Sequence, residues 1–153
     1  MIVRHYGMYE YIPEEFENIT NCGFNFKPCG GLWTSPIDSE YGWIDYINDK
    51  KLFKMYYYES NYFDLEINTD KILKIDSLKD IMKLPLHFFM SNYRNKLNFE
   101  NITKEYDAFW LTYEGMVDTK DNILKGWDCE TILLLNKNCI KKNYKKLKNE
   151  YKI

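Results

Sequence analysis

Two carboxylates precede the most apolar segment of the chain. Residues 127–136 read WDCETILLLN, and the run of branched side chains after Glu130 predicts a buried strand. Because alternate residues of a strand share a face, Asp128 and Glu130 are expected to point to the same side as Ile132. Charged groups are rarely buried without a partner. Glu130 is therefore either a solvated residue at the strand's edge or a carboxylate aimed into a cleft.

A histidine lies near the end of the first predicted strand, within MIVRHYG at residues 1–7. His5 is either hydrogen-bonded to backbone at the strand end or available to a ligand. Arg4 precedes it, and a guanidinium suits the geometry of a phosphate group. The glycine at position 7 ends the segment.

Planar side chains gather around a flexible turn in the segment 27–43, KPCGGLWTSPIDSEYGW. Consecutive glycines at 30 and 31 allow a sharp turn and a close approach of backbone to a ligand. Trp33 then begins a predicted strand that continues with Thr34 and Ser35, and Tyr41 and Trp43 follow. These rings could stack on a nucleobase or a nicotinamide ring. The alternative is that Trp33 belongs to the core.

The cysteines and histidines do not form a recognisable metal motif. The four cysteines are Cys22, Cys29, Cys129 and Cys139, and none has C-x-x-C spacing. The two histidines have no H-x-x-x-H spacing, so we expect no metal site. We expect free thiols, as in other cytoplasmic proteins. A thiol hydrolase that pairs Cys29 or Cys129 with His5 or His87 has no supporting signature.

Strands and short helices are predicted in irregular alternation. Strands are expected within 1–7, 30–36, 108–115 and 128–136, and twice within 61–76 around an Asn-Thr-Asp turn. Short helices are expected within 12–24, 38–50, 77–84 and 98–107. Asp38 or Ser39 would cap the second of these helices, and the polar segment 139–153 permits another. Without a regular β-α-β rhythm, the pattern favours an α+β fold.

Length and charge limit the organisation of the protein. A chain of 153 residues corresponds to one domain, residues 1–153. It contains neither a run of about 18 apolar residues nor a signal-peptide core, which predicts a cytoplasmic protein with no membrane partner. The segment 137–153 carries seven lysines and one glutamate, although the whole chain has a net charge of −2. It is predicted to be a basic C-terminal tail that contributes to the choice of partner.

The three candidate segments resemble, in their order along the chain, the ADP-ribosyltransferase superfamily. RHYG at 4–7 resembles the His-Gly step in the first strand of the poly(ADP-ribose) polymerase and diphtheria-toxin-like branch. GGLWTSP is similar to that branch's Gly-hydrophobic-Tyr motif, with Trp33 in place of Tyr, and to the Ser-Thr-Ser strand of the arginine-using branch. DCE resembles the late segment with the catalytic Glu. The resemblance implies one compact domain in which two small β-sheets pack together, flanked by short helices.

The resemblance also implies an NAD-dependent transfer of ADP-ribose, with no metal. The bond between nicotinamide and ribose breaks through a transition state with positive charge on the ribose. Glu130 would stabilise that charge, and Asp128 would help to position the acceptor. The cofactor-binding residues implied by the resemblance and by the planar side chains are Arg4, His5, Tyr6, Gly7, Trp33, Thr34, Ser35, Tyr41 and Trp43.

Within that assignment, His5 would bind the adenosine ribose, and the backbone at Tyr6 or Gly7 would hold the carboxamide. Arg4 would meet the pyrophosphate, and Trp33 would stack on nicotinamide. Tyr41 or Trp43 would close the other side of the ring. His5, Trp33 and Glu130 are thus predicted to converge on one cleft.

The acceptor would be a protein or a nucleic acid, and a bacterial toxin or a phage-borne host-takeover factor would fit a small free-standing transferase. The alternative is a non-catalytic binding module of the same fold that acts on a protein or nucleic-acid partner.

Overall fold

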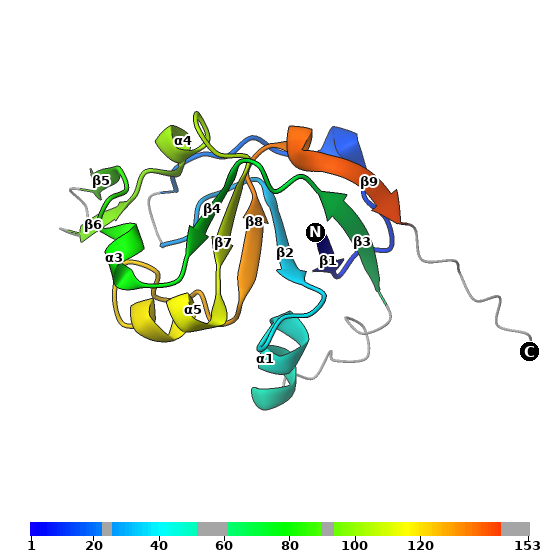
Figure 1. Cartoon of the computed structure of the whole chain (residues 1–153), viewed down its shortest axis with the longest axis horizontal. Coiled ribbons are helices and arrows are strands. Elements are labelled where there is room, and N and C mark those ends of the chain that lie inside the picture. Colours follow the sequence, from blue (N-terminus) through cyan, green and yellow to red (C-terminus); the bar gives the residue numbers. More distant parts are fainter. Residues whose placement is uncertain (23–25, 52–60, 90–93, 145–153) are drawn as a thin grey trace, which may run out of the picture.

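The chain folds around a large mixed β-sheet (Figure 1). The computed structural model describes residues 1–22, 26–51, 61–89 and 94–144. In these residues the strands are β1 (Ile2–Tyr6), β2 (Leu32–Pro36), β3 (Tyr62–Ile67), β4 (Ile72–Ile75), β5 (Leu86–Phe89), β6 (Arg94–Leu97), β7 (Ala108–Leu111), β8 (Thr131–Leu134) and β9 (Ile140–Tyr144). Seven of them form one sheet in the order β4-β7-β8-β2-β1-β3-β9, and β5 pairs with β6 in a second sheet. Within the large sheet β4 and β7 are parallel, whereas the other neighbours are antiparallel.

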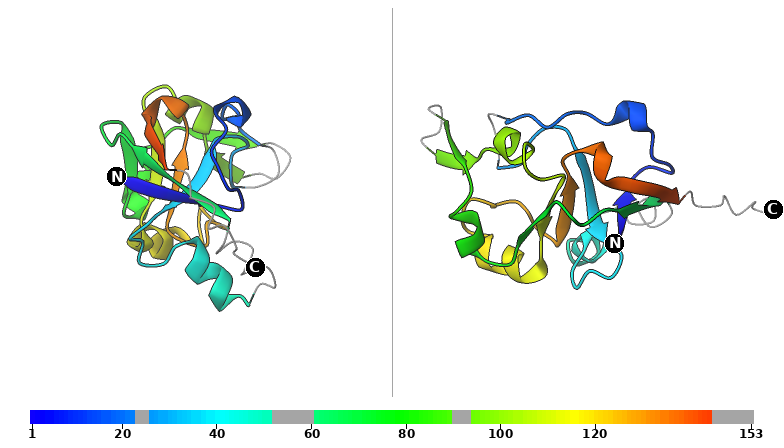
Figure 2. Two further views of the ribbon diagram at one scale, coloured as in Figure 1. Left: turned by 90° about the vertical axis from the view of Figure 1, so that its right-hand side faces the viewer. Right: turned by 45° about the horizontal axis from the view of Figure 1, so that its top comes forward.

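Short helices connect these strands. They are the 3₁₀ turns η1 (Pro13–Glu15) and η2 (Lys137–Cys139) and the α-helices α1 (Trp43–Asp49), α3 (Leu78–Ile81), α4 (Phe99–Ile102) and α5 (Tyr113–Thr119). Helices α3 and α5 lie together near one end of β4 and β7, and α1 projects beyond the end of β2 (Figures 1 and 2). The predicted α+β class and single compact domain are confirmed, with two sheets of seven and two strands.

Each face of the large sheet contributes to its own core cluster, because successive residues of a strand point to opposite sides. From β7 and β8, Phe109 and Leu133 join one cluster with Trp127. Ala108 and Ile132, from the same two strands, join the other. These side chains are at most 2% exposed. Two layers of apolar side chains therefore fix the sheet from both sides.

Two predicted helices begin or end differently in the structure. Helix α1 begins after Gly42 rather than after Asp38 or Ser39, and Asp45 accepts a hydrogen bond from the backbone N–H of Gly42 at 2.8 Å. Residues 40 and 41 lie before the helix, where the backbone N–H of Glu40 donates to the carboxylate of Glu130 and the carbonyl of Tyr41 accepts from the backbone N–H of Glu130. Of the helix predicted within 12–24, the described residues 12–22 form only the single turn η1. No side chain caps that turn, and the backbone at Phe16 is already extended.

Two other segments are arranged differently from the prediction. β3 and β4 follow one another in sequence but lie near opposite edges of the sheet, with β9 beside β3. A helix was considered for 139–153, but residues 140–144 form β9, which pairs with β3. Residues 145–153 lie outside the described residues. The part of the basic segment up to Tyr144 is thus integral to the sheet and is not a separate tail.

We expect removal of residues 137–153 to lower the free energy of unfolding by about 2 kcal/mol, because β9 and the apolar surface of Cys139 and Ile140 are lost. Removal of residues 145–153 alone is the matched control, since it leaves β9 in place. Urea denaturation of both shortened chains measures the difference. Equal stability of the two would contradict a structural role for β9.

Candidate functional site

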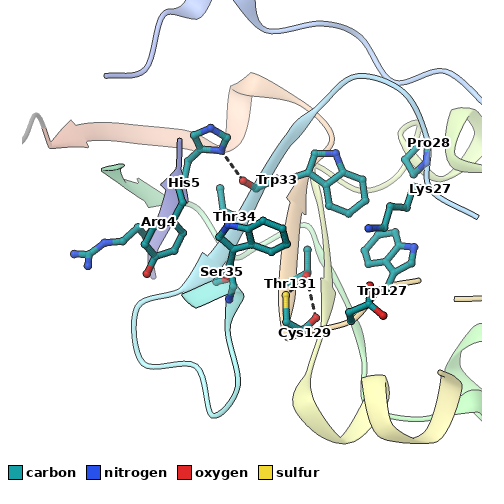
Figure 3. Close-up of a pocket in the computed structure, with 13 residues that line it drawn as sticks. Arg4, His5, Lys27, Pro28, Trp33, Thr34, Ser35, Trp127, Cys129 and Thr131 are labelled. Carbon is teal, nitrogen blue, oxygen red and sulfur yellow. Dashed lines mark hydrogen bonds between the residues drawn. The ribbon is translucent and has the colours of Figure 1, made fainter. Parts of the chain in front are cut away.

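The three segments singled out in the sequence lie on, or directly before, adjacent strands. β8 pairs with β2, and β2 pairs with β1, so 128–130, 30–36 and 4–7 are neighbours although more than a hundred residues separate the first from the last. A cavity of about 410 Å³ opens beside these strands (Figure 3). It is lined by Arg4, His5, Tyr6, Lys27, Pro28, Trp33, Thr34, Ser35, Trp43, Trp127, Asp128, Cys129 and Thr131. Its volume lies in the range of small-molecule and cofactor sites, roughly 300–1,000 Å³.

Three tryptophans supply most of the planar surface of this cavity. Trp33 packs against Trp127 with ring centroids 4.8 Å apart and an interplanar angle of 58°. Trp43, the first residue of α1, stacks on Tyr46 at 5.6 Å. Trp33 was interpreted either as a core residue or as a ligand-binding ring. The structure is compatible with both, because this half-buried ring packs on the core and also lines the cavity. The sequence analysis did not single out Trp127, although this residue directly precedes the candidate residue Asp128.

His5 occupies the gap where β1 and β2 diverge. Its Nδ1 lies 2.7 Å from the carbonyl oxygen of Trp33, and its ring stacks on Phe63 at 5.0 Å. A carbonyl only accepts, so Nδ1 carries the hydrogen and Nε2 of the neutral ring is an acceptor. Burial lowers the pKa of His5 below its ordinary value, and the bond to Trp33 offsets this only in part. His5 is thus both bonded to backbone and part of the cavity wall.

Arg4 is held by a carboxylate on the neighbouring strand β3. Its Nε and Nη2 donate to the two carboxylate oxygens of Asp64 at 2.6 and 2.8 Å, and its guanidinium lies 3.8 Å from the ring centroid of Tyr62. The bonds to Asp64 raise the pKa of Arg4 above its ordinary value. An anionic ligand would therefore have to compete with Asp64 for this guanidinium.

Lys27 is the second cation at the cavity wall, and its Nζ lies 5.5 Å from the ring centroid of Trp33. An ammonium within about 6 Å of an indole face is attracted to the ring. The sequence analysis did not single out Lys27, although it begins the aromatic segment. Figure 3 shows Lys27 and Arg4 toward opposite ends of the residues that line the cavity.

The structure does not bring Glu130 into the cavity, so the predicted convergence of His5, Trp33 and Glu130 is wrong for Glu130. The residue is 6% exposed, and its carboxylate accepts hydrogen bonds from Nε1 of Trp110 at 3.0 Å and from the backbone N–H of Glu40 at 3.1 Å. Trp110 packs on the core cluster opposite to that of Trp33. Burial raises the pKa of Glu130, and the two hydrogen bonds offset part of the rise.

Asp128 does line the cavity, so the expectation that it shares a face with Glu130 is also wrong. The reason is local. β8 begins only at Thr131, so the alternation of a strand does not extend back to Asp128. Asp128 is exposed, and it is the carboxylate among the lining residues.

Glu130 instead organises the connection between β2 and α1. Its backbone N–H donates to the carbonyl of Tyr41 at 2.8 Å, while its carbonyl accepts from the hydroxyl of Ser35 at 3.1 Å. The same hydroxyl accepts from the backbone N–H of Trp43 at 3.1 Å. Glu130 is thereby connected to the helix start that places Trp43 at the cavity.

The remaining predicted ligands have structural partners. The hydroxyl of Thr34 donates to the carbonyl of Ile132 at 2.6 Å. Tyr41 lies outside the lining residues and donates to Asp49 at 2.7 Å, and burial together with this bond raises its pKa to about 12. Tyr6 lines the cavity and its pKa is raised by burial, whereas Gly7 does not line it.

The two glycines at the turn are required by its backbone conformation and close packing. Gly30 and Gly31 have φ values of +78° and +68°, which side chains rarely adopt, and a Cβ on Gly31 would lie 2.6 Å from the carbonyl oxygen of Leu134. Neither glycine lines the cavity. The turn is therefore fixed by its contact with β8.

The four cysteines are either paired in a disulfide or buried. Cys22 and Cys29 are joined by a disulfide, so the expectation of free thiols is wrong for this pair. Cys129 and Cys139 are free and buried. Burial raises the pKa of Cys129, which disfavours the reactive thiolate. In the described part of the chain, no three His, Cys, Asp or Glu side chains are grouped as metal ligands.

Within the described residues, no helix has the length and apolar character needed to cross a membrane.

Comparison of the chain with protein-family models, curated proteins and solved structures gives no match. Any assignment of function therefore depends on the residues and on the geometry of the cavity.

Proposed function

We propose that the protein is an NAD-dependent ADP-ribosyltransferase whose NAD site is the cavity beside β1, β2 and β8. The observation that carries the proposal is the adjacency of the three motif segments around one cavity that combines tryptophans with cations. Planar rings suit the nicotinamide and adenine of NAD, and a cationic side chain at the cavity suits its pyrophosphate. The acceptor is proposed to be a protein or a nucleic acid in the cytoplasm, as for a toxin or a phage factor.

Within this proposal the carboxylate at the reacting ribose is Asp128, because Glu130 is bonded on the other side of the sheet. Positive charge builds on the ribose as nicotinamide departs, and a carboxylate at the cavity wall stabilises that charge. Nε2 of the neutral His5 accepts a hydrogen bond from a ribose hydroxyl. The pyrophosphate lies at Lys27, or displaces Asp64 from Arg4.

The test of the proposal is release of nicotinamide from NAD by the purified protein, with mass spectrometry of added cell extract to find the modified acceptor. Trp43→Leu should raise the KM for NAD about tenfold, since stacking on a base is worth roughly 1–3 kcal/mol. Tyr41→Phe is the matched control, because Tyr41 lies outside the cavity and should leave KM unchanged. No nicotinamide release in the presence of extract would contradict the proposal.

A non-catalytic binding module is the second candidate, and one observation favours it. Glu130 and Arg4, two residues expected to act on NAD, are already bonded to Trp110, Glu40 and Asp64. Under this alternative the same cavity binds a nucleotide without breaking it. Binding of ADP-ribose without any turnover of NAD would support the binding module over the enzyme.

A further inference from the structure

A second cavity, of about 200 Å³, shares no described lining residue with the first. Its floor includes Phe63 and Leu32, which belong to the core cluster of Ile132, whereas Trp33 of the first cavity packs on the other cluster. The lining residues are Met8, Glu10, Tyr11, Ile12, Glu15, Phe16, Glu17, Gly31, Leu32 and Phe63. The segment 8–17 therefore forms most of its wall.

Aromatic rings form the inner surface of this second cavity. Phe63 is 1% exposed and lies at the bottom, and the ring of Tyr11 meets it at a centroid distance of 6.1 Å. Phe16 packs against the same core cluster. The faces of such rings carry negative partial charge, so they attract a cation that lies over them.

The charged groups of the lining are all carboxylates. Glu10, Glu15 and Glu17 are exposed, and the described residues of the lining include no lysine, arginine or histidine. Across the described residues, neither Glu15 nor Glu17 forms an ion pair. This lining is therefore negative, whereas the first cavity has Arg4 and Lys27 in its wall.

We propose that the second cavity binds a small organic cation with an apolar body, such as an alkylammonium or quaternary ammonium group. The aromatic and aliphatic floor would receive the apolar body, and the rings together with the carboxylates would balance the charge. The volume is below that of a nucleotide site, so the ligand is small.

The proposal is independent of NAD chemistry. His5, which lines the first cavity, stacks on Phe63, which lines the second, so the two cavities are adjacent at this pair of rings.

Choline and its neutral isostere 3,3-dimethylbutan-1-ol are the probes, titrated separately into the full chain and followed by protein NMR. We expect choline to shift signals of the segment 8–17 in a saturable way, and to bind at least about fivefold more tightly than the isostere. Phe16→Leu and Glu17→Gln should each weaken choline binding, and both positions are partly or fully exposed, so the fold should persist. Glu114→Gln on α5, outside this lining, is the matched charge control and should bind as the unmodified chain does.

Three results would overturn the proposal. One is equal affinity for choline and the isostere, which would mean that charge plays no part. Another is the absence of saturable shifts in the segment 8–17. The third is unchanged choline affinity in both Phe16→Leu and Glu17→Gln, with folding confirmed by the NMR spectra.

Discussion

Asp128→Asn is expected to lower the rate of nicotinamide release from NAD by roughly 100-fold, which corresponds to about 2.7 kcal/mol. The substitution keeps the size of the side chain but removes the negative charge that the proposed mechanism places beside the ribose. Affinity for NAD should change little, because the tryptophans and His5 bind the ground state, so the loss should lie in kcat rather than in KM. Steady-state kinetics of the variant measures both quantities.

Asp121→Asn is the matched control for this prediction. Asp121 is exposed and lies outside the lining of the cavity, so its variant loses the same charge without touching the site. Normal turnover of Asp128→Asn, in a preparation where the unmodified protein is active, would remove Asp128 from the catalytic role. A loss confined to KM would instead assign it to binding.

Glu130→Ala is expected to lower the free energy of unfolding by about 3 kcal/mol. The substitution leaves two donors, the indole N–H of Trp110 and the backbone N–H of Glu40, without their acceptor in a partly buried place. An unsatisfied buried donor costs roughly 1–3 kcal/mol. The connection from β2 to α1 should loosen as well, because Glu130 is bonded to it. Urea denaturation followed by circular dichroism measures the change.

Glu40→Ala is the control, since the exposed side chain of Glu40 is removed while its backbone N–H still donates to Glu130. The stabilities of Glu40→Ala and the unmodified chain should agree. If Glu130→Ala is equally stable, the network around Glu130 contributes nothing to the fold. If Glu130→Gln keeps full stability yet loses turnover, Glu130 has the catalytic role that its sequence motif predicts, and Asp128 does not.

The sequence by itself determined the elements that depend on local patterns. The alternation of Phe63, Leu65 and Ile67 and the β-branched start of the chain predict β3 and β1, and Ser77 marks the start of α3. The order of the three motif segments identified β1, β2 and the start of β8 as the place to look for a site, and these strands are neighbours. Composition and irregular alternation were sufficient for the α+β class.

Tertiary structure alone decided which side chains face the cavity, because that depends on partners far away in sequence. The bond between Arg4 and Asp64 spans 60 residues and that between Glu130 and Glu40 spans 90, so no local pattern encodes either. Both bonds satisfy a charged group that is at least partly buried. Asp128 could be separated from Glu130 only once the first residue of β8 was known, since side chains alternate inside a strand but not ahead of it.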